Sequence, residues 1–506
     1  MPRPGTRRST DPDRLPDVSA SVRCRRTARG RPVAVTPVTA VATTGIYCRP
    51  DCSARPDPRN VRSFADPAAA EAAGYRACLR CRPYRRAVPV GATGPDLVCR
   101  AVHLVVGGAL DGGTETDLAA RLGVSPRHLR RLFVEHVGAT PDQVARSRRA
   151  HFARRLLDDT DLTVTEIAFA SGFGSVRQLN RACIEIFRAA PLALRARRRR
   201  DDRLVADGGL PLRLPYEGPL DWDGMLAFLA ARAIPGVESV RGGAYRRTVV
   251  VGGDPGVIEV SAGPPGELRL VAHLPHWEGL IHVVARVRRI FALDADPSEA
   301  VGALGDDPVV GPLFRARPGL RVPGCWDGFE TGVRIIAGQQ VAVATASRMA
   351  GAVAARLGRP VPGIDPLGLG TAFPAAADVV PGSLAGIGLT PARQQAVAHF
   401  ATAVAGGQVV LDGSTGLERL TASLEALPGI GPWTAQALAM RLGERDAFPA
   451  GDLAVRRAVG AGTGRPAGAA AIRRAAAGWS PHRAAATFQV WAGPVRAAAG
   501  AVPGGR

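Results

Sequence analysis

The sequence predicts a multidomain chain that is mainly α-helical and contains one α+β unit. Three observations lead to this prediction. Four of the eight cysteines fall in one short segment. Strand-like alternation of apolar residues appears between 210 and 320, whereas 95–200 and the region after 325 show helical spacing broken by Gly and Pro turns. A chain of 506 residues has room for roughly three or four domains.

Shifts in composition divide the chain into successive segments. Residues 1–40 are rich in Arg, Pro and Thr without clear periodicity, and we expect them to be poorly ordered. The remaining segments are predicted to be a small cysteine-rich domain, a helical domain of two similar halves, a linker, an α+β domain and an all-helical domain. Their predicted bounds are 41–92, 93–200, 201–209, 210–322 and 323–498.

The charge balance predicts a polyanionic partner. Lys and Arg number 65 against 44 Asp and Glu, which gives a formal net charge of +21. Such an excess favours DNA or RNA over a membrane surface, although an Arg-rich composition is also typical of a GC-rich genome. No apolar run of about 18 residues is present, and the N-terminal stretch lacks the apolar core of a secretory signal. We therefore expect a cytoplasmic protein without a membrane anchor.

The cysteine cluster predicts a metal site. Cys48 and Cys52 form one close pair, and Cys78 and Cys81 form a second. Two short pairs joined by a longer loop can bring four thiolates around one tetrahedral zinc ion, whereas so few cysteines in so long a chain do not make a disulfide scaffold. The alternative is four unrelated buried cysteines. A site of four thiolates is normally structural, but its excess negative charge can leave one thiolate unusually nucleophilic.

The helical segment contains the same order of helix, glycine turn and helix twice. In 114–136 a helix of small residues, a turn at Gly123 and an arginine-rich helix follow one another, and 162–188 repeats this order with Gly172 in the turn. Arg, Gln and Asn near the start of a second helix are residue types that read bases in the major groove. A helical bundle with solvated arginines is the alternative. The candidate DNA-binding residues are Arg127, Arg130, Arg177, Gln178, Asn180 and Arg181.

A third pattern is LPGIGPWTAQALAMRLGERDAFPAGD at 427–452. Gly429 and Gly431 allow the backbone to approach a phosphate closely, and amides at the start of the following helix can bind it without regard to base sequence. A lone carboxylate, Asp452, ends the stretch. Asp452 can also cap a helix over LAVRRAV, and this role is compatible with a catalytic one.

The first two patterns resemble regulatory families. TTGIYCRPDCSARPDPRNVRSF and AAGYRACLRCRP are similar to the zinc domain of Ada-type alkylation-response proteins, and IAFASGFGSVRQLNRACIEIFRAAPLALR resembles the AraC-type DNA-binding domain. The first resemblance implies that Cys48 is both a zinc ligand and the acceptor of a methyl group from a DNA methylphosphotriester, which strengthens DNA binding. The second implies two recognition helices in successive major-groove segments near a promoter, with RNA polymerase as a partner.

The C-terminal half resembles the helix-hairpin-helix–GPD DNA glycosylases and, within them, the AlkA-type 3-methyladenine glycosylase II. Besides 427–452, the resemblance is carried by LRLPYEGPLDWDGMLAFLAARAIPGVESV at 212–240 and RPGLRVPGCWDGFETGVRIIAGQQVAVATA at 317–346. It implies an α+β domain followed by an all-helical helix-hairpin-helix domain. It also implies excision of a cationic alkylated purine, such as 3-methyladenine or 7-methylguanine, after base flipping.

This resemblance also assigns roles to individual residues. Asp452 would stabilise the oxocarbenium-like sugar and help water to attack it. Gln340 stands where the family has a leucine wedge that fills the gap left by the flipped base. Phe228 and Trp491 could instead be plain core residues. The residues implied around the base are Phe228, Trp433, Trp491 and Gln340.

Two absences narrow the predicted chemistry. Gln436 and Ala437 stand in the region where bifunctional relatives carry a nucleophilic lysine, which predicts a monofunctional enzyme that leaves an abasic site. Ala437 also replaces an aromatic residue of the type enzyme, which predicts a wider pocket or weaker stacking. The Pro-Cys-His-Arg signature of O6-alkylguanine methyltransferases is absent, so direct repair of O6-methylguanine is not expected.

Taken together, the patterns predict a monomeric zinc protein that senses methylphosphotriesters, activates transcription and excises alkylated purines from double-stranded DNA. One alternative is a methyl-sensing regulator whose C-terminal half only binds DNA. The other is a glycosylase whose sensor has decayed.

Overall fold

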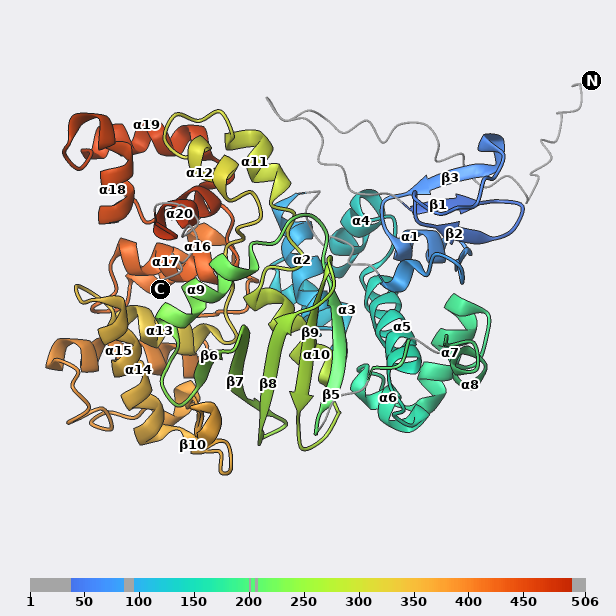
Figure 1. Ribbon diagram of the computed structural model, residues 1–506, viewed down its shortest axis with the longest axis horizontal. Coiled ribbons are helices and arrows are strands. Elements are labelled where there is room, and N and C mark those ends of the chain that lie inside the picture. The colour runs from blue at the N-terminus through green and yellow to red at the C-terminus, as the bar shows by residue number, and fades with distance from the viewer. Residues whose placement is uncertain (1–37, 86–94, 200–201, 205–207, 494–506) are drawn as a thin grey trace, which may run out of the picture. The chain divides into compact units, whose positions relative to one another are not determined.

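The computed structural model describes residues 38–85, 95–199, 202–204 and 208–493 (Figure 1). The prediction of poor order for 1–40 therefore lies outside the described residues except at 38–40. Within the described part of the chain, no helix is both long and apolar enough to cross a membrane.

The first described segment folds as a four-stranded sheet with strand order β3-β1-β2-β4. Strand β2 pairs antiparallel with β1 and parallel with β4. Because parallel strands end at the same edge of a sheet, the residues that follow β2 and β4 meet there. The elements are β1 (Val38–Val41), β2 (Ile46–Cys48), β3 (Val61–Phe64), α1 (Pro67–Ala72) and β4 (Arg76–Ala77).

The next segment is helical and contains the predicted two halves. Each half has a short helix, a turn through a glycine with positive φ and a second helix, and Gly123 and Gly172 are those glycines. Threonine capping boxes start the first helices, and Ser125 and Ser175 cap the second ones. The helices are α2 (Asp96–Val106), α3 (Glu115–Arg121), α4 (Pro126–His136), α5 (Pro141–Asp159), α6 (Val164–Ala170), α7 (Val176–Phe187) and α8 (Pro191–Arg195).

The α+β segment is built on a five-stranded antiparallel sheet of order β5-β9-β8-β7-β6. Buried apolar residues of these strands form one cluster with α9 and α10. This arrangement confirms the strands expected between 210 and 320. The elements are β5 (Leu210–Pro215), α9 (Trp222–Arg232), β6 (Glu238–Arg241), β7 (Ala244–Val251), β8 (Asp254–Ala262), β9 (Glu267–His273), α10 (Leu280–Ile290), α11 (Ser298–Leu304) and α12 (Gly311–Ala316).

The last segment is mainly helical, as predicted. An apolar cluster joins α13, α15, α16 and α17, and in it the rings of Phe329 and Phe400 stack at 5.6 Å between centroids. Two short strands, β10 (Arg359–Pro360) and β11 (Thr371–Ala372), form a small ribbon. The helices are α13 (Gly328–Ala337), α14 (Val343–Leu357), α15 (Pro391–Ala405), α16 (Leu417–Glu425), α17 (Pro432–Leu442), α18 (Leu453–Val459), α19 (Ala469–Trp479) and α20 (Arg483–Trp491).

Candidate functional sites

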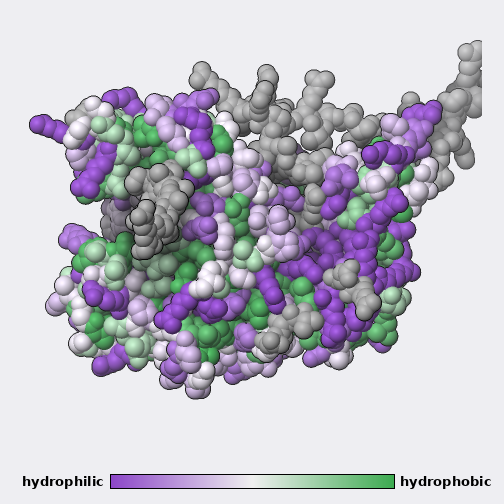
Figure 2. Space-filling view, in the orientation of Figure 1, coloured by the Kyte–Doolittle hydropathy of each residue, from purple (hydrophilic) through white to green (hydrophobic). Residues whose placement is uncertain are grey.

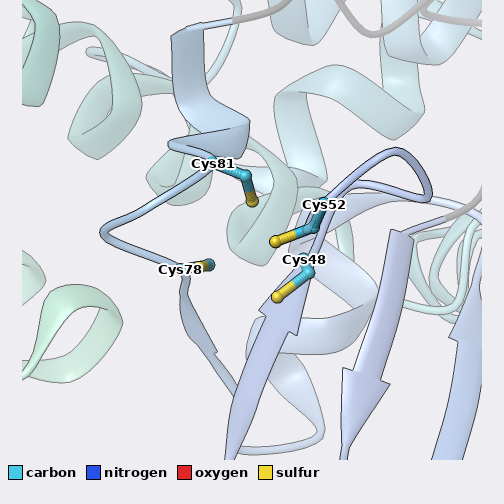
Figure 3. A group of neighbouring side chains, drawn as sticks. All are labelled: Cys48, Cys52, Cys78 and Cys81. Atoms are coloured by element: carbon cyan, nitrogen blue, oxygen red, sulfur yellow. The ribbon is translucent and has the colours of Figure 1, made fainter. Parts of the chain in front are cut away.

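Four cysteine sulfurs converge at one edge of the N-terminal sheet (Figure 3). Cys48 ends β2 and Cys78 follows β4, so the parallel pairing of these strands brings the two pairs together. The four Sγ atoms lie within 4.8 Å of one another. Three of the four residues are buried, and Cys81 is partly exposed. The predicted cluster is therefore formed.

The geometry of these sulfurs fits a tetrahedral zinc ion. Sulfurs bound to zinc at about 2.3 Å lie roughly 3.8 Å apart, so only a small contraction is needed. The backbone N–H of Arg49 donates to Cys81 Sγ at 3.5 Å, a bond that stabilises a thiolate. A hydrogen bond between Cys48 and Cys81 lowers the pKa of Cys81 to about 5 and raises the pKa of Cys48. A bound zinc ion would take the place of the protons on these thiols.

The first helix-turn-helix unit presents an arginine face along α4. Arg127, Arg130 and Arg131 are exposed, and they line a groove of about 540 Å³ together with Glu115 of α3. Arg130 also forms an ion pair with Glu115 at 2.7 Å, so its guanidinium is held against α3. Exposed guanidinium groups in an open groove suit contacts with phosphate and base edges.

The second unit presents a polar face along α7. Arg177, Gln178 and Arg181 are exposed, whereas Asn180 is half-buried and donates to the carbonyl of Val176 at 3.1 Å. Gln178 Oε1 accepts the N–H of Gly174 at 3.0 Å, which leaves its amide NH₂ free to donate. On the face drawn in Figure 2, hydrophilic side chains gather over α5 and α7.

The predicted hairpin joins α16 to α17. Gly429 has a φ of +86°, and a Cβ placed on it would lie 2.7 Å from the Cβ of Ala396 on α15. Only glycine fits this conformation and this close approach. Gly431 precedes Pro432 at the start of α17 and is exposed. Pro432 has no N–H and Thr434 is buried, so the exposed Gly429 and Gly431 are the positions of the hairpin where a phosphate could approach the backbone.

Asp452 is fixed by three N–H groups. Its Oδ1 accepts from the amides of Ala454 at 2.9 Å and Val455 at 3.1 Å, which is the helix-capping role predicted from the sequence. Its Oδ2 accepts the indole N–H of Trp433 at 3.1 Å. The structure thus joins two residues that sequence reasoning placed in one site. The carboxylate is half-buried. Its described hydrogen bonds come from N–H groups, and no described ion pair joins it to a cationic side chain.

The other residues implied around the base are placed differently. Phe228 is 6% exposed, and its ring contacts the guanidinium groups of Arg232, at 3.8 Å from the ring centroid, and Arg441, at 5.3 Å. Trp491 ends α20 and packs, half-buried, against the apolar clusters. Gln340 is exposed in the turn between α13 and α14 and has a positive φ of 57°. Their roles toward a base stay predictions.

Gln436 and Ala437 both face inward on α17. Gln436 Oε1 accepts the backbone N–H of Phe448 at 2.8 Å and so ties α17 to the loop that leads to Asp452. Ala437 is buried at 2% exposure. The whole sequence contains no lysine, so no lysine amine is available at any position. Sequence reasoning identified Gln436 only as a missing lysine, because nothing in its neighbourhood marks it as a partner of Phe448.

Three family models match successive parts of the chain. They are the metal binding domain of Ada at 26–84, a helix-turn-helix domain at 118–197 and the AlkA N-terminal domain at 211–327. These matches confirm the three resemblances, and with the four converging sulfurs they confirm one structural zinc as the cofactor.

Curated relatives extend the match to almost the whole chain. A probable bifunctional transcriptional activator/DNA repair enzyme AlkA of Mycobacterium tuberculosis is 41% identical over 463 residues, which cover 90% of this chain and 92% of the relative. DNA-3-methyladenine glycosylase 2 of Escherichia coli is 36% identical and shares 55% of this chain and 95% of its own length. The bifunctional activator and repair enzyme Ada of the same organism is 37% identical over 26% of this chain and 36% of its own. The chain therefore belongs to the family of bifunctional transcriptional activator/DNA repair enzymes of the AlkA type.

Proposed function

We propose that this protein couples a methylphosphotriester sensor to a DNA glycosylase that hydrolyses the N-glycosidic bond of alkylated purines. The observation that carries the enzymatic part is the Asp452 carboxylate, held by two backbone amides and the Trp433 indole. It lies one helix after the hairpin in which Gly429 and Gly431 are exposed.

The carboxylate suits the bond that is broken. An N3- or N7-methylated purine already carries positive charge and leaves readily, so positive charge builds up on the sugar as the bond breaks. A fixed anion near the anomeric carbon stabilises this charge without reorganising, because its hydrogen bonds exist before the reaction. Asp452 then accepts a proton from the attacking water. Since the chain contains no lysine, the product is an abasic site rather than a strand break through a lysine adduct.

Base flipping exposes the bond to Asp452. The hairpin amides at Gly429 and Gly431 hold the backbone beside the lesion, Trp433 and Trp491 face the extruded base, and Gln340 enters the gap that it leaves. Because unpairing costs least for a damaged base, the flip itself contributes to selectivity.

The variant Asp452→Asn tests the enzymatic part. Asparagine keeps an oxygen that can cap α18, so the fold is expected to survive while the negative charge is lost. We expect release of free 3-methyladenine from alkylated duplex DNA to fall about 100-fold or more, the range found when one such electrostatic group is removed. Release at the wild-type rate would contradict the role of Asp452. No release by the wild type would contradict the glycosylase itself.

Four thiolates around one zinc favour the sensor part. The bound zinc keeps its sulfurs deprotonated at neutral pH. The Cys48 thiolate attacks the methyl carbon of a methylphosphotriester, an S–C bond forms, and the C–O bond breaks with its electrons going to the phosphate oxygen. The phosphotriester becomes an anionic diester, and the thiolate becomes a neutral thioether. The cluster therefore loses one negative charge, which strengthens attraction to DNA.

Methyl transfer from radiolabelled phosphotriester DNA tests this part. Cys48→Ala is expected to take up no label and to leave promoter activation at its uninduced level. Cys99→Ala, a cysteine of α2 outside the cluster, is the matched control and should take up one methyl group per chain. Label in the Cys48→Ala protein would refute the assignment of the acceptor.

The regulatory role implies further partners. We propose promoter DNA bound through α4 and α7, RNA polymerase as the partner in activation, a monomeric state and a cytoplasmic location, where reduced thiols persist. Light scattering on the purified protein with and without operator DNA checks the monomer. Retention of RNA polymerase on promoter DNA only with the methylated protein checks the partner.

A further inference from the structure

The turn between α13 and α14 carries a strained residue at its tip. Gln340 is exposed and has a φ of +57°, a conformation that residues other than glycine rarely adopt. Such strain persists only when the surrounding structure holds the backbone in place, and it is found most often at sites that bind a ligand. The residue before it, Gln339, is only partly exposed, and it provides that support.

Gln339 is bound from two other segments. Its side-chain amide donates to the carbonyl of Gly429 at 2.9 Å and to Thr434 Oγ1 at 3.0 Å, partners that lie in the hairpin and in the first turn of α17. Its backbone carbonyl accepts from the guanidinium of Arg393, in the first turn of α15.

These partners are themselves packed together. Gly429 lies so close to Ala396 of α15 that it has no room for a side chain, and Thr434 is 4% exposed. The hairpin, α15 and the turn of Gln340 therefore form one closed set of contacts. A shift of the hairpin on binding a phosphate must move the tip at Gln340 with it, because both amide protons of Gln339 are committed to the hairpin and α17.

We propose that Gln339 is a positioning residue that links the grip of the hairpin on the DNA backbone to the insertion of Gln340 into the duplex. This inference rests on the proposed function, since it assigns a task only to an enzyme that extrudes a base. Arg393 supports the same link from the backbone side. Gln339 touches neither the base nor the sugar in this scheme and acts through Gln340.

Two matched duplexes test the link. Each contains one 7-methylguanine, paired with cytosine in the first duplex and opposite an abasic-site analogue in the second, where no base pair has to be broken. We expect Gln339→Leu to slow single-turnover excision about tenfold in the paired duplex and less than twofold in the other. Thr434→Val, which removes one acceptor in a buried position, should show the same pattern with a smaller loss.

A double-mutant cycle separates positioning from general destabilisation. If Gln339 acts through Gln340, Gln339→Leu combined with Gln340→Ala is no slower on the paired duplex than Gln340→Ala alone. Gln395→Ala, an exposed glutamine of the same α15 region, is the control and should match the wild type on both duplexes. The proposal would be overturned if Gln339→Leu and Thr434→Val slowed excision equally in the two duplexes. It would also be overturned if the double variant lost as much rate as the product of the two single losses.

A fluorescence measurement distinguishes a failure of the proposed glycosylase function from a failure of the proposed role of Gln339. A 2-aminopurine next to the lesion brightens when the neighbouring base leaves the stack, whether or not the bond is cut. In the Asp452→Asn background we expect this signal to persist, and Gln339→Leu added to it should reduce the signal at least threefold. Loss of excision in the wild type with the signal intact would count against the proposed function alone. An undiminished signal in the Gln339→Leu protein would count against the link.

Discussion

The cysteine cluster and the Asp452 carboxylate hold the two groups to which we assign reactivity, the Cys48 sulfur and the Asp452 oxygens, in opposite ways. Cys48 is 7% exposed and surrounded by three sulfurs from two pairs that lie far apart in the sequence. Asp452 is half-buried and is fixed mainly by the amides of the two residues at +2 and +3 in its own helix. The cluster depends on side chains from two distant pairs, whereas Asp452 takes two of its three hydrogen bonds from its own helix and the third from Trp433. The charge of Asp452 can therefore be removed while its cap is kept, whereas replacing one cysteine removes a quarter of the metal ligands.

The largest expected effect is the loss of zinc from the cluster. Cys78→Ala removes one thiolate of four, and zinc content should fall from one per chain to well below half. The sheet of β1–β4 should then lose its protection from amide exchange, and methyl uptake should stop. Base excision should remain within about twofold of wild type, because the Asp452 centre takes none of its hydrogen bonds from the cluster. A parallel fall in zinc and excision would show that the two regions are not independent.

A smaller effect is expected from the indole that holds Asp452. Trp433→Phe keeps a ring but removes the N–H that donates to Oδ2. A hydrogen bond to a charged group contributes about 1.5 kcal/mol at the lower end, so the excision rate at saturating DNA should fall roughly tenfold. Affinity for an uncleaved abasic duplex should change little, because the ring remains. A loss confined to affinity would assign Trp433 to DNA binding alone.

The smallest effect concerns stability of the hairpin. Gly429→Ala forces a side chain into a positive φ and against Ala396, and should lower the free energy of unfolding of the helical domain by about 1–3 kcal/mol. Gly431→Ala is the matched control, since its φ is −97° and its Cβ would meet no atom within 4 Å. Thermal unfolding followed by circular dichroism measures both. Equal destabilisation by the two variants would contradict the packing described at Gly429.

Features that depend on near neighbours could be predicted from the sequence. The two cysteine pairs, the glycine turns at Gly123 and Gly172 and the cap at Asp452 all follow from residues a few positions apart. The strand β1 forms from VTAV, and three of its four residues are buried. The β-branched residues of this stretch favour a strand even though it contains no aromatic residue.

Contacts between distant segments could not be predicted in the same way. Phe228 was expected to face a base, but which side chains cover its ring depends on how α9 meets α17, and Arg441 comes from that second helix. Gln339 meets Gly429 across 90 residues, and no local periodicity encodes such a pairing. Side chains that work through tertiary hydrogen bonds leave little signal in a single sequence.

The three N–H groups on Asp452 also have a consequence for bound water. An ionised carboxylate offers roughly four acceptor directions, of which Oδ1 uses two and Oδ2 uses one. The remaining direction lies on Oδ2, where a single water can be oriented. Such a water donates to the same oxygen that accepts the Trp433 indole N–H. Removing that indole N–H would open a second direction on Oδ2 to solvent, so the indole also limits how many waters the carboxylate can hold.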